Sequence, residues 1–329
     1  MSEPSPSEPS PSDALAGNQY SRIVTLTLNP ALDLSFHVDN VVPTHKLRAR
    51  RPTYQPGGGG INVSRVCRRL DAETIAVVPL GGPSGRRMAD LLVDELDNDE
   101  VRIIPIQGDT RESIAVVSDG SGEQYRFVLP GSELSTDEVS AAVDATIGAA
   151  DPSVCRCVTV SGSVPSGVDL SFFSELVQRL PHVSVVIDTS GPALMAALNS
   201  GAFLVKPSAR ELASVVDREL STEIDIMHAA REVKAGHDIS VLVVSVGPGG
   251  AFVVTDDETR RLRAPTVKVR SAVGAGDSMV AGIATGLQRG LDLDDAVALG
   301  VAAGTAAVLT DGSDLCDPTQ VEALLGAVQ

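Results

Sequence analysis

The sequence predicts an α/β fold with a largely parallel sheet and a small additional β-sheet. In the second half of the chain, short apolar runs typical of buried strands alternate with stretches that have apolar residues at helical spacing. Two segments, 33–56 and 110–130, interrupt this alternation with extended sequence. The chain has 329 residues, of which 43% are hydrophobic, so it can bury a large core.

The expected elements follow the chain as a first strand, an extended segment, a helix, and then repeated strand–helix pairs. The expected strands of the main sheet are Ile23–Leu28, Thr74–Leu80, Cys157–Ser161, Val183–Asp188, Ala202–Lys206 and Val241–Val246. The expected helices are Ile61–Leu70, Met88–Leu96, Leu170–Leu180, Ala193–Leu198, Ala209–Val216, Met227–Ala235, Ser278–Arg289 and Leu293–Leu309. Segments Ser113–Ser118 and Glu123–Leu129 flank Asp119-Gly120-Ser121-Gly122 and predict a β-hairpin.

Two tandem copies of SEPSP near the N-terminus contain serine, proline and glutamate but nothing that could build a core. We therefore expect residues 1–21 to form a disordered tail before a single domain over 22–329.

Charge and cysteine usage exclude several classes of function. The formal net charge is −17, from 26 Lys+Arg against 43 Asp+Glu, so the surface repels nucleic acid and anionic lipid. The four cysteines form no C-x-x-C and the five histidines no H-E-x-x-H, which argues against a zinc site. No secretory signal and no charge-free apolar stretch of about 18 residues is present, so we expect a cytoplasmic protein without a membrane partner.

Four consecutive glycines, Gly57–Gly60, precede the predicted helix that contains Asn62. Glycines let backbone N–H groups approach a ligand, and a helix N-terminus favours anionic or oxygen-rich groups. The alternative is a tight turn that only permits close packing of helix and sheet. The run is not a Walker A loop, because no lysine of this chain follows a glycine.

A second segment of small residues, Ser271–Ser278, leads into a helix rich in alanine and glycine. The N–H groups at such a helix start can converge on an anion, and Asp277 lies just inside the helix. This arrangement can hold a γ-phosphoryl group while the carboxylate accepts the proton of an attacking hydroxyl. The alternative is an aspartate that simply caps the helix.

Polar residues follow other predicted strands, at the edge where open α/β sheets bind ligands. Lys206 could reach a phosphate and Glu211 could orient water around Mg²⁺, or both could be ordinary surface residues. The glycine-rich run Ser245–Gly250 suits either a nucleotide site or a hairpin. Asp33 could hold sugar hydroxyls or form a turn. Arg111 and Arg126, at the hairpin, could bind a substrate phosphate or be solvated.

Six motifs occur in a fixed order along the chain: TLTLNPALD, PGGGGIN, SGSVPSG, VKPSAREL, SVGPGG and VGAGDSMVAG. Together they resemble the PfkB (ribokinase-like) family of sugar kinases over residues 22–320. The segments GEQYRFVLPG and GVAAGTAA are most similar to its phosphofructokinase branch of minor, type II enzymes. The resemblance implies a ribokinase-like α/β sandwich, a mostly parallel central sheet flanked by helices, with a small β-sheet lid formed by about 33–56 and 110–130.

The resemblance also implies an activity, phosphoryl transfer from MgATP to the 1-hydroxyl of fructose 6-phosphate, and a role for each matched residue. Asp277 would be the general base, and Gly274, Ala275 and Gly276 would supply the anion hole. The sugar would be held by Asp33, Gly58, Gly59, Gly60 and Asn62, and its phosphate by Arg111 and Ser163, with Lys46 reaching in from the lid. ATP and Mg²⁺ would be bound by Lys206, Ser208, Glu211, Ser245, Gly247 and Gly250. The family's lid also pairs subunits, which implies a homodimer.

The chain departs from the family at two places. Ser208 stands where the magnesium motif N-x-x-E has asparagine. Because the serine hydroxyl can still hydrogen-bond metal-bound water, we expect weaker Mg²⁺ affinity rather than loss of activity. A potassium loop matches Val273, Ala307, Thr310, Gly312 and Asp314, with Thr310 and Asp314 replacing Asn and Arg of the close relative. Mostly backbone carbonyls would hold that ion, so we expect the K⁺ site to remain possible.

Two other interpretations of the same residues stay open. A 1-phosphofructokinase or a tagatose-6-phosphate kinase shares every motif quoted above, because the position of the substrate phosphate depends on pocket geometry. A non-catalytic sugar-phosphate sensor with a decayed kinase fold is a different class of protein, and only Ser208 supports it.

Overall fold

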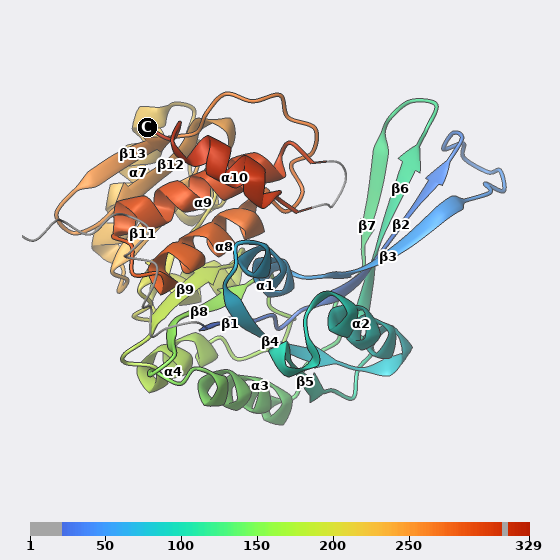
Figure 1. Ribbon diagram of the computed structural model, residues 1–329, viewed down its shortest axis with the longest axis horizontal. Coiled ribbons are helices and arrows are strands. Elements are labelled where there is room, and N and C mark those ends of the chain that lie inside the picture. The colour runs from blue at the N-terminus through green and yellow to red at the C-terminus, as the bar shows by residue number, and fades with distance from the viewer. Residues whose placement is uncertain (1–21, 311–314) are drawn as a thin grey trace, which may run out of the picture.

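The computed structural model describes residues 22–310 and 315–329, and its main body is built on a nine-stranded sheet (Figure 1). The strand order is β13 (Thr259–Arg263), β12 (Gly250–Val254), β11 (Val241–Ser245), β10 (Leu204–Val205), β9 (Ser184–Asp188), β8 (Cys155–Ser161), β1 (Arg22–Leu26), β4 (Glu73–Leu80) and β5 (Val101–Pro105). Neighbours pair in parallel from β11 to β5, and only β12 and β13 are antiparallel. The predicted α/β fold is confirmed. The expected tail, 1–21, lies outside the described residues.

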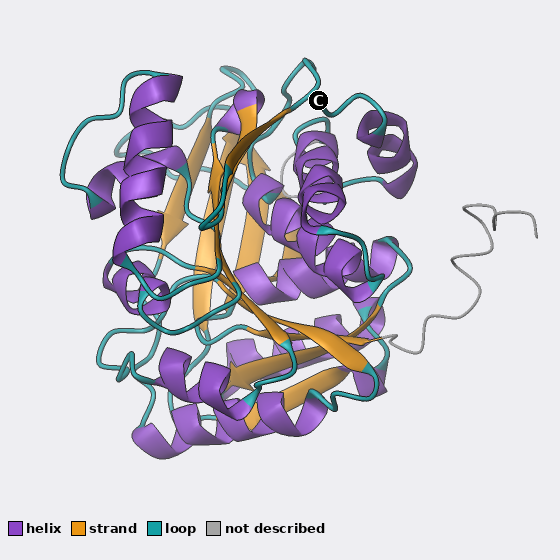
Figure 2. Ribbon diagram, turned by 90° about the vertical axis from the view of Figure 1, so that its left-hand side faces the viewer, coloured by secondary structure: helices purple, strands orange, loops and turns teal. Residues whose placement is uncertain are grey.

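Helices cover both faces of this sheet (Figure 2). One face carries α1 (Gly59–Arg69), α8 (Ala275–Gln288), α9 (Leu293–Ala307) and α10 (Pro318–Leu325) over one apolar cluster. The other carries α3 (Thr136–Ala149), α4 (Phe172–Arg179), α5 (Pro192–Leu198), α6 (Ala209–Val215) and α7 (Glu223–Gly236) over a second cluster. Helix α2 (Gly82–Glu95) packs near β4 and β5, and two short 3₁₀ helices span Asn98–Glu100 and Gly247–Gly249. Continuous burial on both faces explains why the parallel strands are almost entirely apolar.

A separate four-stranded sheet projects from the body (Figure 1). Its order is β3 (Arg50–Gly57), β2 (Ala31–Val38), β6 (Arg111–Ser118) and β7 (Gln124–Val128), so the predicted hairpin is present as β6 and β7. Side chains alternate between the two faces of a strand. One register row, Gln55–Asp33–Ser113–Val128, is polar apart from its last member. The next row, Tyr54–Leu34–Ile114–Phe127, lies on the opposite face and is apolar.

Helices α8 and α9 touch backbone to backbone because glycines stand at their contact. A Cβ atom on Gly282 would lie 2.6 Å from the Leu299 carbonyl oxygen and 2.7 Å from the Gly300 Cα. Such distances leave no room for a side chain, and they explain the alanine- and glycine-rich sequence of both helices. The close contact fixes the position of α8, whose N-terminus points to the carboxyl edge of the parallel strands.

The structure differs from the sequence prediction mainly at short or atypical elements. The sequence did not predict β5, which is a short strand, VRIIP, at the sheet edge. It also did not predict β12 and β13, which follow a glycine-rich loop. Helix α3 was missed although Ser135 and Glu138 form a capping box, a signal readable in the sequence. Several helices begin earlier than expected: α2 by six residues, α7 by four, α8 by three, α1 by two and α5 by one. In α1, α2 and α8 the first turns include glycine or other small residues, which carry no apolar periodicity.

Gly282→Ala is expected to lower the free energy of unfolding by roughly 1–3 kcal/mol, since the added methyl group must push α9 away. Gly148→Ala is the matched control: it is also a helical glycine, with nothing within 4 Å of its Cβ position. That variant should be more stable by roughly 0.5–1 kcal/mol. Urea unfolding measures both, and an unchanged midpoint for Gly282→Ala would contradict the packing argument.

Candidate active site

A cavity of about 430 Å³ lies at the carboxyl edge of the parallel strands, between the main body and the small sheet. The small sheet contributes Ala31, Asp33, Gln55, Arg111, Ser113, Arg126 and Val128. The main body contributes Gly58, Gly59, Asn62, Arg65, Gly162, Ala272, Val273, Gly274 and Asp277. Residues from five separate parts of the chain therefore meet around one hollow, as expected for open α/β sheets.

The start of α8 forms the floor of this cavity. Gly274 precedes the helix with φ of 75°, in the left-handed region that glycine adopts without strain. Ala275, Gly276 and Asp277 are the first three helical residues, so their N–H groups have no acceptor within the helix. These donors make an anion-binding site. Asp277 does not cap the helix, because it lies inside the first turn and its carboxylate accepts a hydrogen bond from Asn62 instead.

The electrostatic surroundings of Asp277 favour a carboxylate that can gain and lose a proton near neutral pH. Burial raises the pKa of Asp277 to about 7, the largest effect. The side-chain amide of Asn62 donates to Oδ2 at 2.8 Å and lowers the pKa. Asp188 and Asp33 raise the pKa by repulsion, and Lys206 lowers it. A base with a pKa near the working pH is well suited to general-base catalysis.

On the small-sheet side, one carboxylate faces two arginines. Burial raises the pKa of Asp33, while a hydrogen bond from Ser113 and the charges of Arg126 and Arg111 lower it. The Arg111 guanidinium donates from Nη2 to the Asn29 carbonyl oxygen at 3.1 Å. Its buried Nε has no partner among the described residues. This arrangement leaves donor capacity for an anion beside a carboxylate that can accept hydroxyl groups.

The opposite side of the site brings Lys206 beside Asp188, at the ends of β10 and β9. Lys206 is only 3% exposed, and its Nζ lies 3.2 Å from Asp188 Oδ2. Burial raises the pKa of Asp188, Lys206 lowers it, and the nearby charge of Glu211 raises it. Asp188 was not singled out in the sequence, although a carboxylate as the last residue of a buried strand was a signal that could have identified it.

Ser208 and Glu211 form the capping box of α6. The Ser208 hydroxyl and backbone N–H both donate to Glu211 Oε2, at 2.8 and 2.7 Å, and the Glu211 N–H donates back to the hydroxyl. An isolated bridge joins Ser208 to Ser245 on the neighbouring strand end. The serine that replaces the family's asparagine therefore fixes the helix start and orients the glutamate.

The donor set fits a magnesium ion that is held mainly by its substrate. No group of three or more His, Cys, Asp or Glu in residues 22–310 and 315–329 could hold a metal. Mg²⁺ commonly keeps several waters and binds through one or two carboxylates plus substrate phosphates. Glu211, with only Oε2 engaged in the capping box, and Asp188 are carboxylates of that kind.

The predicted glycines serve two different purposes. Gly58 and Gly59 line the cavity, and a Cβ on Gly59 would lie 2.7 Å from the Gly162 nitrogen. Gly60 instead packs on β1, where a Cβ would lie 2.5 Å from Thr27 Oγ1. Gly250 is likewise buried, with its Cβ position 2.1 Å from the Leu262 carbonyl oxygen. Close packing leaves no room for a side chain at any of these glycines, since a Cβ on Gly58 would also lie 2.7 Å from Thr27 Cγ2. Gly58 and Gly59 differ from the other two in that they also line the cavity.

Three further predicted residues lie at the margin of the site or away from it. Ser163 is exposed beside cavity-lining Gly162 and accepts a hydrogen bond from Asn29 at 2.9 Å. Gly247 has φ of 57° and nothing within 4 Å of its Cβ position, so the loop after β11 is open there. Lys46 is exposed in the segment between β2 and β3 and is not among the residues that line the cavity. Its role remains a prediction.

The potassium loop is only partly within the described residues. Val273 lines the cavity. The Ala307 carbonyl oxygen accepts a hydrogen bond from Thr310 Oγ1 at 2.8 Å. Gly312 and Asp314 lie outside the described residues. The K⁺ site therefore remains a prediction.

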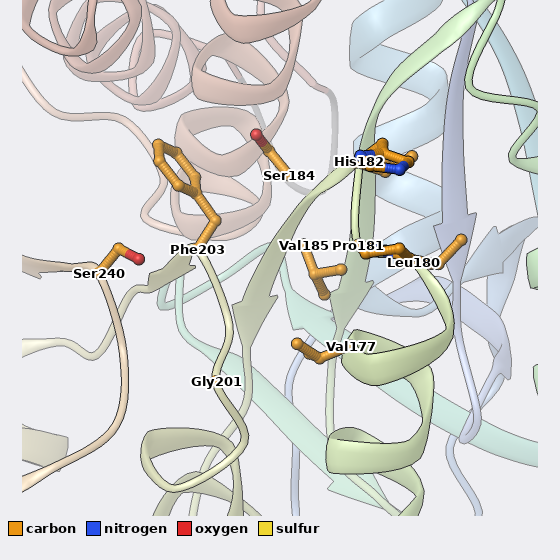
Figure 3. Close-up of a pocket in the computed structure, with 10 residues that line it drawn as sticks. Val177, Leu180, Pro181, His182, Ser184, Val185, Gly201, Phe203 and Ser240 are labelled. Atoms are coloured by element: carbon orange, nitrogen blue, oxygen red, sulfur yellow. The ribbon is translucent and has the colours of Figure 1, made fainter.

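A second hollow of about 410 Å³ lies at the opposite, amino-terminal edge of the same sheet (Figure 3). Most of the residues that line it are apolar, with His182 at one side, Ser184 at the start of β9 and Ser240 just before β11. It lacks the glycine-rich helix start and the carboxylates that surround Asp277. We therefore place the functional site at the carboxyl edge.

Comparisons with known proteins place the chain in a family. The pfkB family carbohydrate kinase pattern matches residues 27–320. ATP-dependent 6-phosphofructokinase isozyme 2 of Mycobacterium tuberculosis (strain ATCC 25618 / H37Rv) is 42% identical over 303 residues, covering 92% of this chain and 88% of that protein. The phosphofructokinase-2 of Escherichia coli solved with potassium has a TM-score of 0.86 and 37% identity, over 93% of this chain and 99% of that chain. The same enzyme solved with fructose-6-phosphate has a TM-score of 0.82 and 36% identity, over the same shares of both chains.

Most of the chain is covered by these matches, and the sandwich with a separate small sheet agrees with the fold that the motifs implied. With Asp277 at the small-residue start of α8, beside Asn62 and opposite Asp33, the chain belongs to the pfkB family of carbohydrate kinases.

Proposed function

We propose that this protein is an ATP-dependent 6-phosphofructokinase, which phosphorylates the 1-hydroxyl of fructose 6-phosphate to give fructose 1,6-bisphosphate. One observation carries the proposal: Asp277 and the free N–H groups of α8 face Asp33, Arg111 and Arg126 across a single cavity. A base, an anion hole and a cationic phosphate site are what transfer to a sugar phosphate requires. The similarity to enzymes named 6-phosphofructokinase supports the choice of sugar.

The chemical step follows from the geometry at α8. Asp277 accepts the proton of the 1-hydroxyl of the sugar. The oxygen of that hydroxyl bonds to the γ-phosphorus of ATP, and the bond between the γ-phosphorus and the leaving oxygen of ADP breaks. The N–H groups of Ala275, Gly276 and Asp277 point at the transferred group and stabilise its negative charge. Proton acceptance and charge stabilisation therefore come from the same helical turn.

The sugar is held from the small sheet and from α1. Asp33 accepts hydrogen bonds from sugar hydroxyls, and the backbone at Gly58 and Gly59 lies close enough to contact the ring. Arg111 and Arg126 bind the 6-phosphate, since arginine forms paired hydrogen bonds with phosphate oxygens. Ser163 and Lys46 are further candidates for this phosphate on the strength of the family motif.

The nucleotide lies along the strand ends on the other side of Asp277. Lys206 contributes positive charge to the phosphates, and the loop of Ser245, Gly247 and Gly250 borders the nucleotide. Mg²⁺, when bound, neutralises phosphate charge, and Glu211 and Asp188 would hold its water molecules.

K⁺ at the loop near Val273 and Ala307 is part of the proposal because a structural relative was solved with potassium. ATP and sugar phosphates are cytoplasmic metabolites, which supports a cytoplasmic location.

The apolar face of the small sheet supports a homodimer as the functional unit. Its rows include Phe127, 55% exposed on the outermost strand, and Tyr125, 38% exposed. Arg87 of α2 covers only one end of this face, 3.4 Å from the centre of the Tyr54 ring. An exposed apolar sheet face of this kind is stabilised by a second copy of itself, which two-fold symmetry permits. A related phosphofructokinase-2 is described in a tetrameric form.

A coupled assay with MgATP and a panel of fructose 6-phosphate, fructose 1-phosphate and tagatose 6-phosphate tests the substrate, with and without K⁺. The highest kcat/KM is expected for fructose 6-phosphate. A preference for either other sugar would identify the alternative kinase of the same family. Thermal stabilisation by a sugar phosphate without any ADP formation would instead favour a sensor.

Asp277→Asn is expected to lower kcat by roughly 10²–10⁴-fold with little change in fold, because the amide cannot accept the hydroxyl proton. In the unmodified enzyme the active form is the deprotonated one, so kcat/KM should fall about tenfold per pH unit below the pKa of about 7 of Asp277 and level off above it. Steady-state rates between pH 5.5 and 9 check both. Near-normal turnover by Asp277→Asn would exclude this residue as the base.

Phe127→Asp is expected to shift the protein towards monomer, because a charge on the apolar face cannot be buried between two copies. Val269→Asp is the matched control, since Val269 is also apolar and 51% exposed but belongs to the connection between β13 and α8 and not to the small sheet. Sedimentation velocity measures the distribution. Equal dimer content in both variants would show that this face does not pair subunits.

A further inference from the structure

A chain of side-chain contacts runs from Asp277, at the cavity, to the end of α2. Asn62 Nδ2 donates to Asp277 Oδ2 at 2.8 Å, and Arg65 Nη1 donates to Asn62 Oδ1 at 3.3 Å. Arg65 in turn donates from Nε and Nη2 to the two carboxylate oxygens of Glu95. Asn62 and Arg65 lie one turn apart on α1, and Glu95 is the last residue of α2.

This geometry makes Asn62 depend on Arg65 for its orientation. A carboxamide has a donor end and an acceptor end of almost equal shape, so only its partners decide which end faces a neighbour. Arg65 offers donors alone, and it therefore attracts the amide oxygen. The amide nitrogen must then face the carboxylate of Asp277. The reverse orientation would bring two acceptor oxygens together.

Arg65 is in turn held so that it cannot leave this position easily. It is only 8% exposed, and the bidentate contact with Glu95 uses one edge of its guanidinium group. Nη1, the atom left over from that contact, is the one that reaches Asn62. Glu95 holds the guanidinium directly, and the charge of Arg65 also acts on the nearby carboxylate of Asp33, so moving this largely buried arginine would cost two favourable charge interactions.

We propose that Arg65, anchored by Glu95, is a positioning residue that fixes the carboxamide of Asn62 and thereby keeps the catalytic carboxylate ready to accept a proton. The proposal rests on the proposed function of Asp277 as general base. It adds a largely buried residue at the cavity wall, whose Nη1 reaches the Asn62 carboxamide and which acts on Asp277 through that contact.

The groups around Asp277 explain why a single oriented amide matters. Asp188 from β9 and Asp33 from β2 both disfavour its charged form, and Lys206 after β10 favours it. Asn62 from α1 supplies the hydrogen bond that lowers the pKa most. Losing that bond leaves burial and two like charges against a single lysine, so protonation of Asp277 shifts to higher pH.

A double-mutant cycle on the full-length enzyme tests the proposal with Arg65→Gln, Asn62→Ala and the combination. Arg65→Gln is expected to move the acidic limb of the kcat/KM profile to higher pH and to lower the value roughly 2–10-fold at pH 6.5, the size of one hydrogen bond. The loss should shrink towards pH 9. In the Asn62→Ala background, Arg65→Gln should change the profile little, because the residue through which it acts is gone. Equal losses in both backgrounds would overturn the proposal.

Arg68→Gln is the matched control for any loss of stability. Arg68 lies on the same helix and pairs with Asp97 and Glu100, just beyond the end of α2, without contacting Asn62. It should change the urea midpoint without moving the pH profile. Arg65→Lys keeps the charge but not the fork that holds Glu95 and Asn62 together, so it should resemble Arg65→Gln. Full activity and an unshifted profile in Arg65→Lys would show that charge alone acts and would also overturn the proposal.

A titration independent of turnover separates this proposal from the proposed function. The ¹³C resonance of the Asp277 carboxyl group, assigned by its loss in Asp277→Asn, should titrate at higher pH in Arg65→Gln than in the unmodified protein. An unchanged titration would contradict the positioning role, whatever the activity. Absence of sugar-phosphate kinase activity in the unmodified protein would instead contradict the proposed function, and the carboxyl titration would still decide the role of Arg65.

Discussion

The first turn of α8 combines an anion-binding set of N–H groups with a buried carboxylate, and the rest of the site depends on this combination. Its unpaired N–H groups attract negative charge, while the carboxylate of Asp277 on the same turn is buried among other carboxylates. Burial raises the pKa of Asp277 to about 7, which keeps the group able to exchange a proton at neutral pH. The backbone contact of α8 with α9 at Gly282 fixes this turn, and the hydrogen bond from Asn62 fixes the carboxylate.

Charge is distributed locally rather than over the whole protein. The net charge is −17, yet the proposed ligands are anions. Arg111, Arg126 and Arg65 line the cavity, and Lys206 lies buried beside Asp188, so cationic groups are concentrated where phosphates would bind. Helix-start N–H groups add donors without adding net charge. Anion binding therefore needs no basic surface, because short-range donors act inside a partly closed hollow where salt and water screen them less.

Motifs with a strict local requirement were predicted well. Gly274 needs a left-handed φ, and Asp277 follows it at the spacing of a first helical turn, so both could be identified from neighbouring residues. The sequence did not show whether other glycines line the cavity or only permit close packing. Gly58 and Gly60 stand in one run and both pack against Thr27, and Gly58 lines the cavity as well. The local sequence is the same for a glycine that lines the cavity and for one that only packs, so the two roles can be told apart only from the position of the neighbouring strand. At Ser208 the sequence predicted weaker Mg²⁺ affinity, which stays a prediction, whereas its place as the cap of α6 became clear only from its bonds to Glu211.

The sequence by itself determined the alternation of strands and helices, the small β-sheet, the family and the position at the start of α8 of the aspartate that we propose as the general base. All of these depend on periodicity or on residues adjacent in the chain. Only the tertiary structure decided which side chains meet. Asn62 and Asp277 are 215 residues apart, and Arg65 reaches Glu95 over 30 residues and a second helix. Contacts of this kind depend on how two packed helices are placed, and no local pattern encodes that distance.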